Sequence, residues 1–168
     1  IRIYSGDLTD PDVRKRLIQT KPHILLHTAG FKYNAALQDP KNQEMGLDVE
    51  FFMYVEMMRL AEEAGVERMI VISTPKAVYP RTFYGYLKRL AEIAVNAYRE
   101  SPTRFTAFRL VNVIGSQGSV VHEVRKQLHR RMAPDRWGPI LIPHPWSRAR
   151  SRYFASMRET VEATLYSV

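Results

Sequence analysis

The sequence predicts an α/β protein built on a doubly wound parallel sheet. Three apolar runs, at residues 23–30, 69–72 and 105–114, have the length and composition of strands. Helical patterns separate these runs, and an alternation of this kind predicts parallel strands with helices packed against them. We expect residues 1–168 to form one domain, because this length is enough to bury a sizeable core.

The first residues, 1–4, have the pattern of a strand end and lead into a turn that contains Asp7. Asp10 and Pro11 supply an N-cap and a proline at the first helical position, which predicts a short helix to about Thr20. From the residues alone, Asp7 is interpreted as a turn residue.

The strand predicted at residues 23–30 ends in the small residues Ala29 and Gly30. Small residues let a ligand come close to the carboxyl end of the strand, which is where open α/β sheets bind ligands. Lys32 follows directly. The sequence leaves two roles open for it: a contact to a phosphate or sugar oxygen, or a solvated loop position.

A long helix is predicted from Asp39 and Pro40, which cap its start, to Ala64, with Gly65 as the stop. Its middle part is apolar on nearly all sides. One stripe is enough to cover a sheet and consists of Val49, Met53, Met57, Leu60 and Ala64. The surplus apolar residues, which need a second partner, are Phe51, Tyr54, Val55 and Met58. Core packing is the default for such residues, and a subunit interface is the alternative.

The stretch from Arg68 to Glu92 carries the strongest chemical pattern. A buried strand ends at Thr74, a loop with two prolines follows, and the next helix carries Tyr84 and Lys88. Because the last two residues are four apart, they share one helix face. A free tyrosine titrates near ~10, and an ammonium beside the phenol favours the phenolate that a general base needs. These three side chains predict an alcohol-oxidising site beside a nicotinamide.

The C-terminal part is predicted to contain a basic helix at residues 120–131, a strand at 140–143 and a helix at 157–166. The basic cluster consists of Arg125, Lys126, His129, Arg130, Arg131 and Arg136. It lacks interleaved aromatic residues and any recognised binding motif, so we expect no nucleic-acid partner. A solvated helix face is the first interpretation, and attraction to phosphate or a membrane surface is the second.

The composition excludes several classes of site. The net charge of +8 is compatible with nucleic acid, a membrane surface or an anionic nucleotide. The absence of cysteine excludes disulfides and thiolate chemistry and is typical of a cytoplasmic protein. No apolar run approaches the ~20 residues that span a bilayer. The five histidines show no metal-ligand spacing, and no phosphate-binding G-x-x-x-x-G-K-[ST] loop is present.

Two segments carry a resemblance to a known family. Residues 73–80, S-T-P-K-A-V-Y-P, and residues 84–89, Y-G-Y-L-K-R, are similar to S-T-D-K-A-V-x-P, followed by a Tyr or Met and then G-x-x-K-R. This pattern belongs to the extended short-chain dehydrogenase/reductases, and in particular to the UDP-N-acetylhexosamine 4,6-dehydratases of capsule and flagellin-sugar synthesis. The resemblance covers almost all of the chain. Pro75 stands where that family has Asp.

The resemblance implies roles for individual residues. Tyr84 would take the proton of the sugar 4-hydroxyl, with Lys88 as its electrostatic support. Thr74 would hydrogen-bond the same hydroxyl, and Lys76 would belong to the acid/base pair that eliminates water. The implied cofactor site consists of Asp7, Ala29, Gly30, Tyr84 and Lys88. The implied contacts to the nucleotide sugar come from Lys32, Asn112 and Arg152.

The resemblance therefore implies an NAD- or NADP-dependent dehydratase or epimerase that acts on a UDP-amino sugar in surface-polysaccharide synthesis. The substrate-binding part would run from about residue 112 onward. A homodimer is implied, formed through the helices around residues 49–60 and 84–98. The choice between NAD and NADP, the sugar and the reaction outcome stay open.

A second hypothesis is a non-catalytic domain used for binding or assembly. A dinucleotide site on a parallel sheet needs a first strand and a G-x-G-x-x-G turn, and the sequence has no such turn. We therefore expect a Rossmann-like sheet that lacks its first βαβ unit. This absence and Pro75 favour the second hypothesis.

Overall fold

The computed structural model describes residues 3, 5–30, 37, 39–116, 119–131 and 153–167. The chain divides into two compact units. Residues 1–110 and 164–168 form the first unit, and residues 111–163 form the second. The elements of the first unit are α1 (Pro11–Gln19), β1 (Ile24–His27), η2 (Pro40–Asn42), α2 (Gln43–Leu47), η3 (Asp48–Phe52), α3 (Met53–Glu63), β2 (Arg68–Ser73), η4 (Pro75–Ala77), α4 (Phe83–Ala97) and β3 (Arg104–Arg109).

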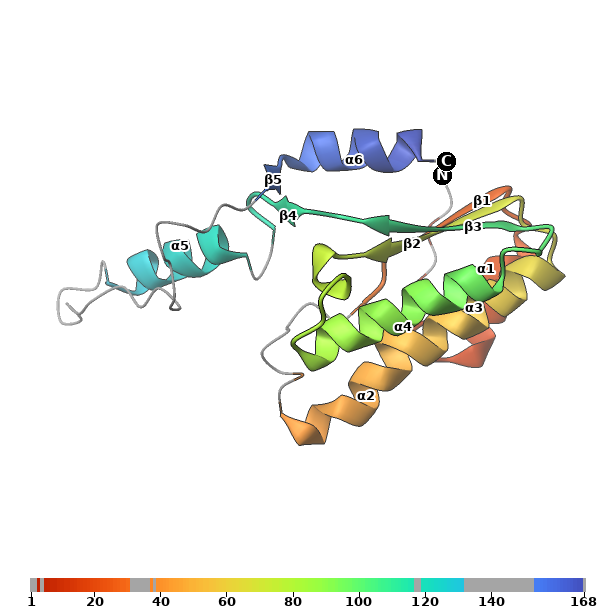
Figure 1. Ribbon diagram of the computed structural model, residues 1–168, viewed down its shortest axis with the longest axis horizontal. Helices are drawn as coiled ribbons and strands as arrows, with labels where there is room; N and C mark the ends of the chain where they lie inside the picture. The colour runs from red at the N-terminus through yellow and green to blue at the C-terminus, as the bar shows by residue number, and fades with distance from the viewer. Residues whose placement is uncertain are drawn as a thin grey trace. The chain divides into compact units, whose positions relative to one another are not determined.

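The first unit contains a three-stranded parallel sheet in the order β1-β2-β3, which confirms the predicted α/β class. Met69 of β2 lies beside Leu25 of β1 on one side and beside Phe105 of β3 on the other. The apolar run of β2 is buried, as its composition predicted. Figure 1 shows α3 and α4 running along one face of the sheet. All three strands point the same way, so their carboxyl ends share one edge.

Helical structure runs without a gap from Pro40 to Glu63, as predicted, but it is not one regular α-helix. A 3₁₀ turn (η2), a short α-helix (α2) and a π-helical segment (η3) precede α3. A π segment holds one extra residue per turn, so it changes which side chains point inward without a Pro or Gly to signal it. The ends were predicted correctly: Asp39 caps Lys41 N, and Gly65 follows α3 with a φ of +70°.

The predicted split of this helix into a stripe that covers the sheet and a surplus apolar set also changes. Tyr54 and Met58, counted above as surplus, are 1% and 0% exposed and lie in the core. They are buried because α3 packs against α1 and α4 as well as against β2. Phe51 and Val55 remain partly exposed, and Phe52 is 52% exposed.

The loop after β2 lies on the first turn of α4. Thr82 caps α4 by accepting a hydrogen bond from Gly85 N at 3.2 Å. A Cβ at Gly85 would come within 3.1 Å of the Lys76 carbonyl oxygen and 3.3 Å of Pro80 Cα. A larger residue at position 85 would crowd these atoms, so the glycine allows η4, which carries Lys76, to lie this close to α4.

The second unit contains β4 (Asn112–Val113), α5 (Val120–Arg131) and β5 (Phe154–Ala155), with most of α6 (Met157–Tyr166). The strand predicted at 105–114 is broken: β3 ends at Arg109, and β4 pairs in parallel with β5 in a separate two-stranded sheet. The predicted helices at 120–131 and 157–166 are confirmed. The predicted strand at 140–143 lies outside the described residues. Within the described ranges, no helix is long and apolar enough to cross a membrane.

Candidate active site

Tyr84 and Lys88 lie together on α4, as their spacing predicted. The Lys88 Nζ atom is 5.7 Å from the centroid of the Tyr84 ring. The Nζ atom of Lys76, from η4, lies at the same distance of 5.7 Å from this ring. The phenol is partly buried, and two ammonium groups from different elements approach it. Of these two ammonium groups, that of Lys88 lowers the pKa of the phenol, against the effect of its burial.

Lys88 is one of the few buried charged residues, with 4% of its surface exposed. Its ammonium is ion-paired with Glu50 Oε2 at 2.7 Å. It also donates hydrogen bonds to the Tyr54 hydroxyl at 2.7 Å and to the Ile72 carbonyl oxygen at 3.0 Å. An ammonium has three hydrogens, so these three acceptors account for all of them. The side chain is therefore fixed in position by protein groups from three elements.

Glu50 was not singled out from the sequence. It belongs to the π-helical segment η3 and is 0% exposed. Gly30, in the segment that follows β1, leaves room for it, since a Cβ there would lie 3.0 Å from Glu50 Oε1. The available signal was a lone carboxylate within the apolar run V-E-F-F-M-Y-V. Carboxylates are almost never buried without a partner, so a Glu in such a run, if buried, would need a cation from another element.

The pKa of Tyr84 differs from the sequence-based expectation. Burial of the phenol raises its pKa above the usual value of 10.0, and Lys88 lowers it. Glu50 and Tyr54 raise it further, so the net direction is upward. The expected lowering by Lys88 is present, but burial of the phenol outweighs it, and the Glu50 carboxylate beside the ammonium adds to the rise. Tyr84 is therefore a neutral phenol at pH 7 in this chain.

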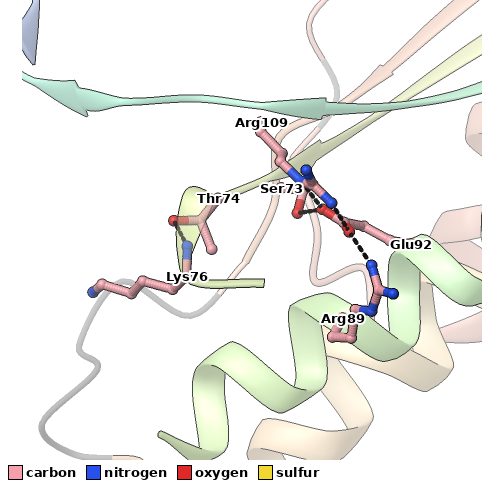
Figure 2. A network of polar contacts seen from close by, with 6 residues as sticks. All are labelled: Ser73, Thr74, Lys76, Arg89, Glu92 and Arg109. Atoms are coloured by element: carbon pink, nitrogen blue, oxygen red, sulfur yellow. Dashed lines mark hydrogen bonds and ion pairs between the residues drawn. The ribbon is translucent and has the colours of Figure 1, made fainter. Parts of the chain in front are cut away.

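Thr74 and Lys76 lie where β2 ends. The Thr74 hydroxyl accepts a hydrogen bond from Lys76 N at 3.5 Å and caps η4, in which Pro75 is the first residue. Figure 2 shows the Lys76 side chain extending away from the end of β2. The structure thus brings Thr74 and Lys76 into one turn, with Lys76 facing Tyr84.

A second polar cluster at the strand ends was missed by the sequence analysis. Glu92 of α4 accepts two hydrogen bonds from Arg109, each at 2.7 Å, and one from the Ser73 hydroxyl at 2.6 Å. Arg89 approaches the same carboxylate at 3.4 Å. Figure 2 shows these groups converging on Glu92 from β2, β3 and α4. The Arg109 hydrogen bonds, above all, lower the pKa of Glu92. The cluster ties α4 to the carboxyl ends of both strands. Three of its members, Arg89, Glu92 and Arg109, line a cleft of about 540 Å³.

His27 lies buried beside Tyr54, with ring centroids 4.2 Å apart and the rings nearly perpendicular. Burial, assisted by the charge of Lys88, lowers the pKa of His27 to about 4. The imidazole is therefore neutral at pH 7. Among the described residues, its Nε2 atom has no hydrogen-bond partner.

The other predicted site residues have varied surroundings. Asp7 is exposed and accepts hydrogen bonds from the Thr9 amide and hydroxyl, both at 2.8 Å, as a turn residue does. Ala29 is partly buried, and its carbonyl accepts the Tyr54 hydroxyl hydrogen at 2.9 Å. Asn112, in the second unit, donates to the Tyr153 carbonyl oxygen at 3.0 Å. Lys32 and Arg152 lie outside the described residues.

Two further predictions concern metal ions and the basic helix α5. The described residues contain no group of three or more metal-ligating side chains that would hold an ion. On α5, the described basic side chains Arg125, Lys126 and His129 are exposed, as a solvated face requires. Arg136 lies outside the described residues, and nothing is described of the side chains of Arg130 and Arg131.

A parallel α/β sheet whose middle strand leads through S-T-x-K to a helix with Y-x-x-x-K defines an extended short-chain dehydrogenase/reductase. Within this class, residues 1–168 match the family described as polysaccharide biosynthesis protein, and the chain belongs to that family.

Curated relatives bear related names. The chain is 32% identical over 156 residues to the probable polysaccharide biosynthesis protein EpsC of Bacillus subtilis, covering 92% of this chain and 24% of EpsC. It is 41% identical over 130 residues to a UDP-N-acetylglucosamine 4,6-dehydratase (inverting) of Campylobacter jejuni, covering 75% of this chain and 38% of that enzyme. The chain thus spans well under half of the length of both relatives.

Solved structures share the fold. The epimerase Mth375 of Methanothermobacter thermautotrophicus superposes with a TM-score of 0.81 at 21% identity, covering 98% of this chain and 55% of the epimerase. The Bordetella bronchiseptica enzyme WbmG, solved with NAD and UDP, superposes with a TM-score of 0.64 at 20% identity, covering 96% of this chain and 51% of WbmG.

Proposed function

We propose that the complete protein is an NAD- or NADP-dependent enzyme that oxidises C4 of a UDP-N-acetylhexosamine in polysaccharide biosynthesis. The observation that carries this proposal is the Tyr84 phenol with two ammonium groups, each 5.7 Å from its ring, beside the carboxyl ends of parallel strands. The dehydratase name of one relative and the NAD and UDP bound to WbmG support it.

The residues present fit the nicotinamide part of a dinucleotide. The donor set joins a phenol to a fixed ammonium, which suits proton transfer at an alcohol. At the neighbouring strand end, Gly30 is as small as a residue can be, and Ala29 precedes it. We assign Ala29, Gly30 and Tyr84 to the nicotinamide side and Asp7 to the adenine side. When bound, an oxidised nicotinamide supplies the electron-pair acceptor for the carbinol and adds a positive charge to the site.

Residues of the protein then accept and return the proton of the 4-hydroxyl. Tyr84 accepts this proton as phenolate and returns it as phenol. Lys88 supplies positive charge that opposes the upward shift of the Tyr84 pKa, and the Lys76 ammonium lies 5.7 Å from the centroid of the same ring. Because its three hydrogens have protein acceptors, we assign Lys88 an electrostatic role. The Thr74 hydroxyl orients the substrate hydroxyl.

We assign the nucleotide sugar to the part from about residue 112 onward. Asn112, Lys32 and Arg152 are the proposed contacts. A guanidinium binds phosphate oxygens through two parallel hydrogen bonds, which is the role proposed for Arg152.

Pro75 favours C4 epimerisation or reduction over dehydration. Elimination of water across C5 and C6 needs an acid and a base with separated pKa values. Lys76 supplies one such group, and Pro75 has no proton to supply the other. With the bound nicotinamide as hydride acceptor, oxidation at C4 needs from the protein itself only Thr74, Tyr84 and Lys88, all of which are present.

The second candidate is a binding or assembly domain without turnover. The upward shift of the Tyr84 pKa favours it, because a neutral phenol is a poor base.

The experiment that separates these candidates uses the complete protein with UDP-N-acetylglucosamine and either cofactor. Proton NMR of the sugar identifies the 4-epimer, the 4-keto-6-deoxy product or unchanged substrate. Conversion at C4 supports the enzyme. Nucleotide-sugar binding by calorimetry without any conversion, with both cofactors, would overturn it in favour of the binding domain.

A further inference from the structure

Glu50 and Lys88 form an ion pair that is almost completely removed from water. Their side chains are 0% and 5% exposed, and the Nζ–Oε2 distance is 2.7 Å. A buried ammonium without a counter-charge loses its proton, because desolvation disfavours the charged form. The charge of Lys88 in this core therefore needs a carboxylate beside it.

No other described group supplies that negative charge. Burial raises the pKa of Tyr54 and of Tyr84, so both phenols are neutral. His27 is neutral at pH 7 because its pKa lies near 4, and Lys76 adds positive charge. The buried carboxylate of Glu92, one turn further along α4, is held by Ser73 and Arg109.

We propose that Glu50 is a positioning residue for the Tyr84–Lys88 pair: its carboxylate keeps Lys88 protonated inside the core and fixes the ammonium beside the Tyr84 ring. The π-helical segment η3 carries this carboxylate, and Gly30 leaves the space for it. That the Lys88 charge assists turnover rests on the proposed function. That Lys88 carries this charge does not.

The consequence for Tyr84 follows from the geometry. Tyr84 faces an ion pair whose two charges are 2.7 Å apart, and not an isolated cation. Loss of the carboxylate converts Lys88 to a neutral amine, which withdraws the positive charge from the phenol. Glu50 thus affects Tyr84 in two opposite ways: its carboxylate raises the pKa of the phenol directly, and it holds the Lys88 ammonium that lowers this pKa.

The test compares Glu50→Gln with Glu56→Gln in the complete protein. Glu56 lies on α3 but is paired with Arg59 at the surface, so its variant controls for loss of one carboxylate. The readout is the ¹⁵Nζ chemical shift of Lys88 at pH 8, assigned with Lys88→Arg. The expected result is an ammonium signal in the parent and in Glu56→Gln, and an amine signal in Glu50→Gln. An ammonium signal in folded Glu50→Gln would overturn the proposal.

A second measurement serves if Glu50→Gln folds poorly. The unfolded chain still binds the lysine proton that the folded variant lacks, up to about pH 10. The Tm of Glu50→Gln should therefore rise from pH 7 to 10 relative to that of Glu56→Gln. A constant difference would show a packing role alone and would overturn the proposal. Both readouts are independent of turnover, so failure of the proposed function would leave their outcome unchanged.

Discussion

The imidazole of His27 packs edge-on against the ring of Tyr54, with centroids 4.2 Å apart, in a part of the core that contains the Lys88 ammonium. Burial and the neighbouring Lys88 ammonium both disfavour a positive charge on His27. The pKa of His27 accordingly falls from 6.5 to about 4. The packing that holds Lys88 therefore makes the fold sensitive to acid.

The first prediction concerns this sensitivity. Between pH 6.5 and 4 the unfolded chain binds a proton at His27 that the folded chain does not, so the free energy of unfolding declines with falling pH. The loss amounts to about 3 kcal/mol by pH 4. His27→Phe keeps an aromatic ring beside Tyr54 and should flatten this decline in urea titrations at several pH values. The exposed His23→Gln is the control, and an equally steep decline in His27→Phe would refute the assignment.

The second prediction concerns Glu92. Arg109 and Ser73 lower its pKa, so its contribution to stability is present above the unfolded pKa of about 4.3 and is lost as pH falls below it. Glu92→Gln should cost about 1–3 kcal/mol at pH 7, since it weakens charge-assisted hydrogen bonds of a buried group. Arg89→Ala, at 3.4 Å and half exposed, should cost less than ~1 kcal/mol. Equal losses in the two variants would contradict the account of this cluster.

The third prediction is the homodimer. Tyr86, Leu90 and Ile93 are exposed at i, i+4 and i+7 on α4, and Phe52 is exposed on η3. An apolar stripe of this kind is typical of an interface. Leu90→Glu and Phe52→Glu should convert a dimer into a folded monomer in sedimentation at micromolar concentration. Met58→Glu should instead unfold the chain, because Met58 is in the core. A monomeric parent protein would contradict the interface.

The fourth prediction concerns the reaction outcome. Pro75 is exposed at the start of η4, and the Thr74 cap does not depend on it, so Pro75→Asp should fold. We expect the 4-keto-6-deoxy product from UDP-N-acetylglucosamine only with the variant, because only the variant offers an acid beside Lys76. Abundant product from the parent protein would refute this, and the Pro75→Ala variant controls for loss of the ring.

The sequence predicted the features that depend on local spacing. Tyr84 and Lys88 are one turn apart on one helix, so helix geometry alone brings them together. The buried run of β2, the Asp39 cap and the Gly65 stop are likewise local signals.

The missed features join elements that are distant in the sequence. Glu50 meets Lys88 only because η3 packs against α4, and Glu92 meets Arg109 only because β3 pairs with β2. The π segment itself leaves no Pro or Gly as a signal. Spacing along one element cannot indicate such pairs, although a lone carboxylate within an apolar run was a usable hint.

The fifth prediction tests the central claim that Tyr84 moves the proton of the 4-hydroxyl. Tyr84→Phe removes one oxygen atom and leaves the ring beside Lys76 and Lys88. The decisive measurement is the turnover rate of the complete Tyr84→Phe protein with a UDP-N-acetylhexosamine, with nucleotide-sugar affinity measured in parallel. The account predicts a rate lower by ~10² to 10⁴ with affinity largely unchanged. Turnover equal to that of the parent protein would contradict it.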